Sequence, residues 1–381
     1  MNEVSLQNDR TTGVPVRQLT NYFAHSYHLY FTNPGWWDGG RRLVFGSDRG
    51  NASNLYSIEI ESGDITPITE LGSSDSRQGW QNGCINPTRD ELYSWRGKEL
   101  WAIDLRTRKH RVLMTTPEGF GGGCEGISAD GKYVTSSLMK RPDVGPVDLG
   151  AGYVGFNEIW AAKPLCRLVR VPSDGSNHEP QVLHEEHAWL GHVNPSSKLP
   201  HILTYCYEGP WTKVGQRMWG LDVNTGRTWK IRPQVPGEMM GHEYWLTDGE
   251  TVGYHGKLAD GQPVFGFVRY DDTNAVEIQF NYDSNHVHSN TKDLVVADGP
   301  AKGLSPYVVL CKFHDNKMIG PRVLCTHRGS RHTQHLHIHP RISPDNKYVL
   351  YTADPRGYGN LYTVALPEFD SLPLLSDLVK S

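Results

Sequence analysis

Hydrophobic and polar residues alternate along this chain in runs of a few residues, separated by short turn-forming stretches. In the segment 34–71, a turn at 38–40 leads into the alternating stretch RLVFG at 42–46. After a loop comes NLYSIEIESGDITPIT, which predicts two short strands joined at 62–64. Alternation with a period of two is typical of antiparallel strands, and a glycine between small polar residues is typical of a hairpin turn. The pattern predicts β-structure with no long helices.

The same order of turn, strand, loop and hairpin recurs along the chain. Similar units begin near residues 34, 85, 127, 192, 242, 286 and 339. Units of roughly 40–60 residues that each hold four short antiparallel strands are typical of a β-propeller. The sequence therefore predicts one all-β domain, residues 1–381, folded as a seven-bladed propeller. A β-sandwich with accidental similarity is the alternative, and the regular recurrence argues against it.

The last unit lacks an outer strand after GNLYTVALPE, whereas the segment 12–21 (TGVPVRQLTN) reads as an extra strand. We expect the ring to be closed by pairing of these N-terminal and C-terminal segments.

Composition narrows the class of protein. The 38 basic and 42 acidic residues give a net charge of −4 without a basic stripe, so nucleic acid is not an expected partner. The N-terminus lacks the charge and apolar run of a secretory signal, and no stretch of about 18 apolar residues predicts a membrane span. The six cysteines are far apart without a CxxC pair, which favours free thiols. We expect a cytoplasmic protein.

Histidines gather where the innermost strands should line the central channel of a propeller. They are His192, His242, His286, His288, His337 and His339. In HVH and HIH the two histidines are two residues apart, so on a strand both would face the channel. Neutral imidazoles on neighbouring blades can bind Mn, Fe, Ni, Cu or Zn. The alternative is that they are hydrogen-bonded core residues, a role we expect for His332 and His335.

Longer motifs support a family resemblance. They are HLYFTNPGWWDGGRRLVFGSDRGNASNLYSI (28–58), GQRMW (215–219), MMGHEYW (239–245), HVHSN (286–290) and QHLHIHPR (334–341). Over nearly the whole chain they resemble the oligogalacturonate lyases of polysaccharide lyase family 22. That family has a seven-bladed propeller whose channel holds a divalent metal, usually manganese, bound by three histidines and a glutamine.

The resemblance implies roles for particular residues. Gln334, His337 and His339 match three of the metal ligands, and the fourth is His286 or His288. Counting back from the turns favours His286, with His288 as its substitute. The histidine of the GHE motif, His242, matches the catalytic base, and Arg217 in QRMW matches a catalytic arginine that contacts the substrate.

The implied reaction explains this choice of residue types. A uronate lyase removes the C5 proton beside the C6 carboxylate and expels the C4 oxygen, so a cation must offset the carboxylate charge. Neutral ligands leave the metal its full charge, and positive charge nearby keeps a histidine base deprotonated. Arg217 would bind a substrate carboxylate or stabilise the intermediate. Arg49, Arg341 and His192 are further candidates for substrate contacts. No residue stands out as the acid for the leaving oxygen.

Two other functions remain open from the sequence alone. The first is a lyase of the same mechanism that acts on another uronate oligosaccharide. The second is a TolB-like propeller that only binds partners and whose histidines are structural. We do not expect a prolyl-peptidase-like hydrolase, because only about 15 residues follow the last unit, too few for a catalytic domain.

Overall fold

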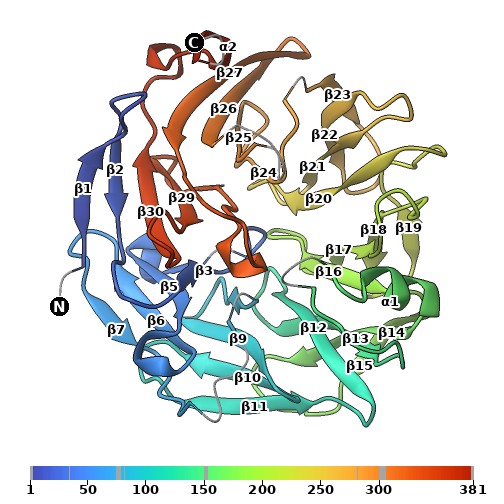
Figure 1. Ribbon diagram of the computed structural model, residues 1–381. Helices are drawn as coiled ribbons and strands as arrows, with labels where there is room; N and C mark the ends of the chain where they lie inside the picture. Colours follow the sequence, from blue (N-terminus) through green and yellow to red (C-terminus); the bar gives the residue numbers. More distant parts are fainter. Residues whose placement is uncertain are drawn as a thin grey trace.

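The computed structural model describes residues 3–33, 35–73, 79–80, 82–149, 153–280, 282–299 and 306–378. In this part of the chain the strands form seven antiparallel sheets, which are arranged as blades around a central channel (Figure 1). The prediction of a seven-bladed propeller is confirmed.

The blades follow one another in chain order, and within each blade the strands run from the channel outwards in the following order. The first holds β3 (Ser26–His28), β4 (Trp36–Trp37), β5 (Arg42–Ser47), β6 (Asn54–Glu59) and β7 (Ile65–Pro67); the second holds β8 (Cys84–Ile85), β9 (Glu91–Arg96), β10 (Glu99–Asp104) and β11 (His110–Thr115). The third holds β12 (Phe120–Ile127), β13 (Tyr133–Lys140), β14 (Leu165–Pro172) and β15 (Gln181–His187); the fourth holds β16 (Leu190–Pro195), β17 (Ile202–Tyr207), β18 (Met218–Asp222) and β19 (Thr228–Lys230). The fifth holds β20 (Met239–Trp245), β21 (Thr251–Lys257), β22 (Pro263–Arg269) and β23 (Val276–Gln279); the sixth holds β24 (Val287–His288), β25 (Leu294–Ala297), β26 (Tyr307–His314) and β27 (Lys317–Thr326). The seventh holds β28 (Arg341–Ile342), β29 (Tyr348–Ala353), β30 (Asn360–Ala365), β2 (Pro15–Gln18) and β1 (Ser5–Asn8).

The hydrophobic core lies between the blades. Because blades pack face to face, their middle strands are buried on both sides, and every residue of β9 is buried. Outer strands lack this cover, and every residue of β1 is exposed. Between the third and fourth blades, Leu168 of β14 packs with Leu203 and Tyr205 of β17. Burial of apolar surface between neighbours therefore holds the ring together.

The seventh blade combines the two ends of the described chain. Residues Val16–Gln18 of β2 pair with β30, and β1 adds a further strand outside β2, as Figure 1 shows. Val14 and Val16 join the apolar cluster of this blade. The segment 12–21 thus contributes a strand next to the C-terminal strands, and the ring closes through main-chain pairing.

The innermost strand of the first blade is interrupted. β3 pairs with one end of β5 and β4 with the other, and residues 29–33 between them leave the sheet. In the channel, Phe31 is completely buried and contacts the rings of His242, His286 and His339. The unit expected to begin near residue 34 starts at Pro34, which lies outside the described residues.

The segment HLHIH does not form the regular strand assumed from its sequence. Gln334–Leu336 forms a 3₁₀ turn, and β28 begins only at Arg341. His339 has a positive φ of 44°. Strand alternation therefore was the wrong local description, and a turn with a left-handed residue orients these side chains instead.

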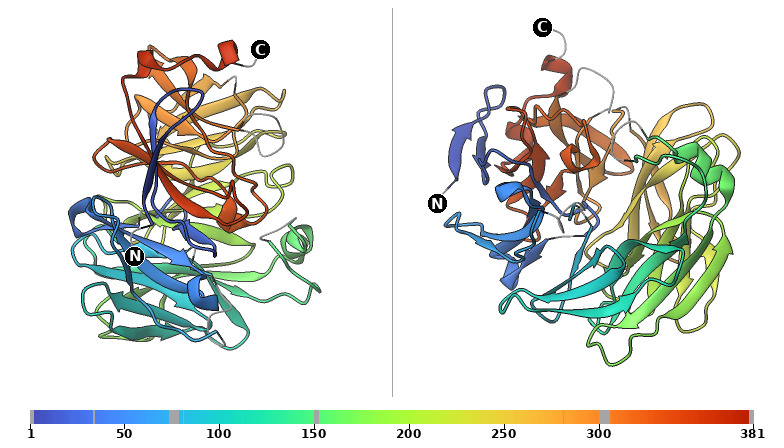
Figure 2. Two further views of the ribbon diagram at one scale, coloured as in Figure 1. Left: turned by 60° about the vertical axis from the view of Figure 1, so that its left-hand side comes forward. Right: turned by 60° about the horizontal axis from the view of Figure 1, so that its bottom comes forward.

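An arm between β13 and β14 carries α1 (Phe156–Ala162) and projects from one face of the ring (Figure 2). A second α-helix in the described part of the chain, α2 (Leu375–Leu378), lies near the C-terminus. Among the described residues, no helix has the length and apolar character needed to cross a membrane.

Candidate active site

A cleft opens at the end of the channel near α1. It consists of two adjoining cavities of about 830 and 500 Å³. Both are lined by Tyr153, Phe156, Trp211, His242 and Gln334. The larger also contains His192 and Arg217, and the smaller His255 and His286. The cleft therefore combines an aromatic wall with a group of titratable side chains.

Bulges in the innermost strands place two of these histidines. In β16 and β20 the pairing register shifts directly after Gly191 and Gly241, and the next residues, His192 and His242, have φ values of 45° and 52°. A bulge turns a side chain away from the regular alternation of its strand. Histidine tolerates the left-handed region better than most residues do. The dipeptide Gly-His is the local sequence signal for this geometry.

Three imidazoles form a compact cluster in the channel. One nitrogen from each of His286, His337 and His339 lies within 4.8 Å of the others. Nδ1 of His337 and Nε2 of His339 are buried without a hydrogen-bond partner. Burial lowers the pKa of His337 to about 3 and that of His339 well below its ordinary value. Both rings are therefore neutral and have a nitrogen lone pair with which to bind a metal ion.

Asp298, which directly follows β25, orients one histidine of the cluster, His286. Its Oδ2 accepts a hydrogen bond of 2.9 Å from His286 Nδ1, and its Oδ1 accepts the main-chain N–H of the same residue. Burial alone would raise the pKa of Asp298, but His286 and Arg331 lower it, so it remains a carboxylate. The bond leaves Nε2 of His286 free to bind a ligand.

His288 does not belong to this cluster. Its Nδ1 accepts the main-chain N–H of Ile342, and its ring lies against Tyr244. It lines a different cavity, which contains neither His286 nor His242.

The cluster fits a divalent metal ion. It offers neutral nitrogen donors, two of them with buried atoms that lack any protein partner, and one ring is oriented by a carboxylate, as is common for metal-bound histidines. Gln334, whose side chain carries an amide oxygen, lines the same cleft as His286. A second group of possible metal ligands consists of His192, Cys206 and Glu243. In this group the carboxylate of Glu243 already forms an ion pair with Arg217, which makes it a less suitable metal ligand.

His242 lies beside this cluster, with its ring centroid 4.9 Å from that of His286. Its Nδ1 is 2.8 Å from Nε2 of His255. The ring of His255 also forms a hydrogen bond with the main-chain carbonyl of Asn285. Because the single N–H of the neutral His255 ring donates to this carbonyl, its Nε2 is left to accept the Nδ1–H of His242. Burial, followed by nearby positive groups, lowers the pKa of His242. His242 therefore presents an unprotonated Nε2 in a cleft.

Arg217 belongs to a buried ionic network. Its Nη1 is 3.3 Å from Glu208 and its Nε is 3.5 Å from Glu243. Nε2 of His192 lies 2.9 Å from Glu208. Burial alone would lower the pKa of His192, but Glu208 raises it. The two carboxylates hold the guanidinium at the edge of the larger cavity.

The other residues suggested by the sequence lie elsewhere. Arg49 is outside the cleft, where it pairs with Glu3 at 2.8 Å and covers the ring of Tyr56. Arg341 lines the same separate cavity as His288. His335 stacks on Tyr27 at 4.3 Å at the border of the cleft, and His332 is exposed.

Sequence reasoning missed four residues of this site, namely Glu208, Glu243, His255 and Asp298. Glu243 follows His242 directly in GHE and could have been noticed there. The other three lie on strands next to the innermost ones, or at their ends, and only the folded chain brings them to the histidines.

Proteins of one family resemble this chain over most of its length. A family model described as oligogalacturonate lyase matches residues 3–302. An oligogalacturonide lyase of Pectobacterium atrosepticum is 26% identical over 94% of this chain and 95% of its own length. An oligogalacturonate lyase of Dickeya dadantii is 25% identical over the same shares.

Solved structures agree with these relatives. An oligogalacturonate lyase in complex with manganese superposes with a TM-score of 0.86 at 25% identity, covering 96% of both chains. An oligogalacturonate lyase from Vibrio parahaemolyticus gives a TM-score of 0.85 at 24% identity, covering 96% of this chain and 97% of its own, and supports the fold.

Proposed function

Because this chain belongs to the oligogalacturonate lyase family, we propose that it cleaves oligogalacturonides by β-elimination and releases a 4,5-unsaturated uronate. The observation that carries the proposal is the position of His242 beside the cluster of His286, His337 and His339 in one cleft. An unprotonated imidazole next to a cation site is what proton removal beside a carboxylate requires. We place the reaction in the cytoplasm, since all six cysteines are free thiols.

The metal site is the first part of the proposal. His286, His337, His339 and Gln334 would hold a divalent ion, which we take to be manganese, the metal of the solved relative. When bound, such an ion offsets the charge of the uronate carboxylate and so makes the neighbouring C–H bond more acidic. Asp298 fixes the ring of His286 through Nδ1 and keeps Nε2 available.

His242 is the proposed base. Its Nε2 takes the C5 proton while its Nδ1–H remains bonded to His255. The C5–H electron pair forms the C4=C5 double bond, and the C4–O bond breaks. The imidazolium formed in this way can pass its proton to the departing oxygen, which restores neutral His242. General base catalysis of this kind contributes about 10²–10⁴-fold.

Arg217 and the aromatic wall would position the sugar. Arg217 is a rigid donor, since Glu208 and Glu243 hold its guanidinium from two sides. Its charge at the cavity edge suits a carboxylate of the oligouronide. Tyr153, Phe156, Trp189 and Trp211 line the same cavity and offer apolar faces for the sugar rings. His192, bonded to Glu208, completes the charged side and is the remaining candidate for a substrate contact.

The test of the reaction is the variant His242→Ala. We expect a loss of about 10²–10⁴-fold in the formation of the C4=C5 double bond, which is measured by ultraviolet absorbance with trigalacturonide as substrate. Metal content should stay unchanged, because His242 is outside the ligand set. His332→Ala is the matched control, since this exposed histidine lies next to the cluster in sequence and should be dispensable. Normal turnover by His242→Ala would overturn the assignment of the base.

Removal of the metal tests whether the proposed metal site is needed for the reaction. Dialysis against a chelator should abolish activity, and addition of Mn²⁺ should restore it, with about one ion per chain by metal analysis. Activity that survives complete removal of metal would contradict the proposal. A panel of oligouronides other than galacturonides distinguishes this substrate from the alternative uronates.

A further inference from the structure

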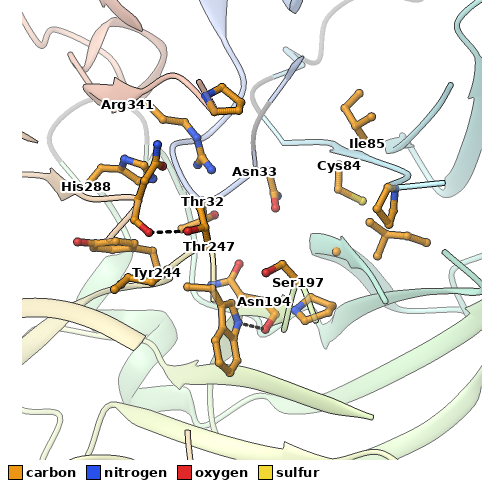
Figure 3. Close-up of a pocket in the computed structure, with 18 of the residues that line it drawn as sticks. Thr32, Asn33, Cys84, Ile85, Asn194, Ser197, Tyr244, Thr247, His288 and Arg341 are labelled. Carbon is orange, nitrogen blue, oxygen red and sulfur yellow. Dashed lines mark hydrogen bonds between the residues drawn. The ribbon is translucent and has the colours of Figure 1, made fainter. Parts of the chain in front are cut away.

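A second cavity of about 320 Å³ occupies the other part of the channel (Figure 3). Innermost strands of several blades contribute to it, including Cys84 of β8, Asn194 of β16, Tyr244 of β20 and Arg341 of β28. It shares no lining residue with either cavity of the cleft. Phe31 lies between the two regions, in contact with His242 and His286 on one side and with Tyr244 on the other.

The guanidinium of Arg341 points into this cavity (Figure 3) and has no counterion among the described residues. Its Nη1 is buried without a partner, and no hydrogen bond or ion pair joins its side chain to any residue in the described part of the chain. The guanidinium carbon lies 5.9 Å from the ring of Trp36. Such a buried charge calls for an anion.

Two buried arginines of this chain have carboxylate partners. Arg217 contacts Glu208 and Glu243, and Arg232 contacts Glu238 and Glu277. Arg341 is only partly buried, but it differs from both because its enclosed Nη1 has no partner. The described lining of its cavity contains no aspartate or glutamate, so none of these lining residues supplies a counterion.

Further hydrogen-bond donors line the cavity. Nδ1 of His288 accepts the N–H of Ile342, so the neutral ring carries its proton on Nε2. Nδ2 of Asn194 is buried and has no partner. An arginine, an imidazole N–H and an amide N–H are all donors, which is the lining expected of an anion site.

We propose that this second cavity binds a small organic monocarboxylate, no larger than a monosaccharide acid. One guanidinium balances one negative charge, and its planar fork matches the two oxygens of a carboxylate. The apolar side chains of Tyr244, Trp245 and Leu246 provide a surface for an organic body, which a bare inorganic ion would not use. The volume of about 320 Å³ is at the lower end of the range for ligand sites and limits the ligand to one sugar ring.

Calorimetric titration of the metal-loaded protein tests this assignment. The probes are sodium D-galacturonate and sodium acetate, with sodium chloride and inorganic phosphate as comparisons. We expect a carboxylate site, separate from any binding in the cleft, whose affinity falls at least tenfold in Arg341→Gln. Arg217→Gln is the matched control, because a ligand bound in the cleft would be lost there and a ligand in the second cavity would be retained.

Three results would overturn the proposal. The first is unchanged carboxylate binding by Arg341→Gln, and the second is loss of that binding in Arg217→Gln. The third is binding of chloride or phosphate at least as tight as that of the carboxylates. If Arg341→Gln fails to fold, as judged by thermal unfolding, Arg341→Lys keeps the charge and loses the fork, and its carboxylate affinity should still fall.

Discussion

One hydrogen bond decides which nitrogen of His242 can act as a base. His255 accepts the Nδ1–H of His242 at 2.8 Å and so keeps the lone pair on Nε2. His255→Phe keeps an aromatic ring and removes the acceptor. We expect kcat to fall about tenfold to a hundredfold, since loss of a buried hydrogen bond costs roughly 1–3 kcal/mol. The measurement is kcat and KM for trigalacturonide, with kcat affected more than KM.

A neighbouring position on β21 provides the control for His255. Tyr254 donates a hydrogen bond of 2.8 Å to Glu277, away from the cleft. Tyr254→Phe removes a hydrogen bond from the same strand and should leave kcat unchanged. Equal losses in both variants would mean that His255 acts only through stability.

Asp298 should govern metal affinity. Asp298→Asn keeps the shape of the side chain and removes the charge that orients His286, so we expect a 10-fold to 100-fold weaker affinity for Mn²⁺. Titration of the metal-free protein with Mn²⁺ measures this. Asp345→Asn is the comparison, because Asp345 accepts a hydrogen bond from Ser343 in a surface turn and should have no effect. Unchanged affinity in Asp298→Asn would argue against His286 as a ligand.

From the sequence, the candidate metal ligands were easier to find than the residues that form hydrogen bonds with them. His286, His337 and His339 stand in short motifs whose spacing draws attention to them. Asp298 is twelve residues from His286 and lies in VADG, where nothing distinguishes it from a turn aspartate. Its role follows from the pairing of β24 with β25, which only the folded sheet reveals.

At the level of strands, bulges in the innermost strands orient the side chains of His192 and His242. Gly191-His192 and Gly241-His242 occupy matching positions in neighbouring blades, and β12 has a similar register shift between Gly122 and Glu125. The repeats predicted the strands because alternation and turn residues are local properties. They could not predict the bulges, which depend on the pairing of one strand with the next.

The bulge in β12 leaves Glu125 completely buried, and burial raises the pKa of its carboxyl to about 8. Between about pH 4.5 and 8 the folded protein therefore keeps a proton that the unfolded chain has lost, so the free energy of unfolding falls as the pH rises through this range. Glu125→Gln should lose this dependence and be more stable than the wild type at pH 8. Thermal unfolding at pH 5 and pH 8 measures the difference.

An exposed acid is the control for this effect. Glu118 lies on the surface directly before β12, and Glu118→Gln should follow the wild-type pH dependence. If Glu125→Gln loses as much stability between pH 5 and 8 as the wild type does, another group must be responsible.

For the whole molecule, stability should depend on closure of the ring. Deletion of residues 1–18 removes β1 and β2, exposes the edge of β30 and removes Val14 and Val16 from a buried cluster. Two buried valines contribute about 3–6 kcal/mol, a large part of a typical stability. We expect a lower Tm and self-association through the free edge, measured by thermal unfolding and size-exclusion chromatography.

A shorter deletion distinguishes the effect of opening the ring from the effect of removing N-terminal residues that do not close it. Deletion of residues 1–8 removes β1, whose side chains are all exposed, and the ion pair of Glu3 with Arg49, but it keeps β2 paired with β30. This variant should lose much less stability. Similar losses for both deletions would show that the pairing of β2 contributes little.

The same pairing orders events during protein synthesis. Residues 15–18 leave the ribosome early, yet β30, their partner strand, comes at 360–365. The growing chain is therefore an open arc in which β2 stays unpaired until β30 has been synthesised. The cluster of His286, His337 and His339 also comes from the last two blades, so the proposed metal site can form only after both have been synthesised. Metal binding at the proposed site would therefore require both of these blades, and a translation product truncated before β24 would carry the proposed base, His242, without the proposed cation site.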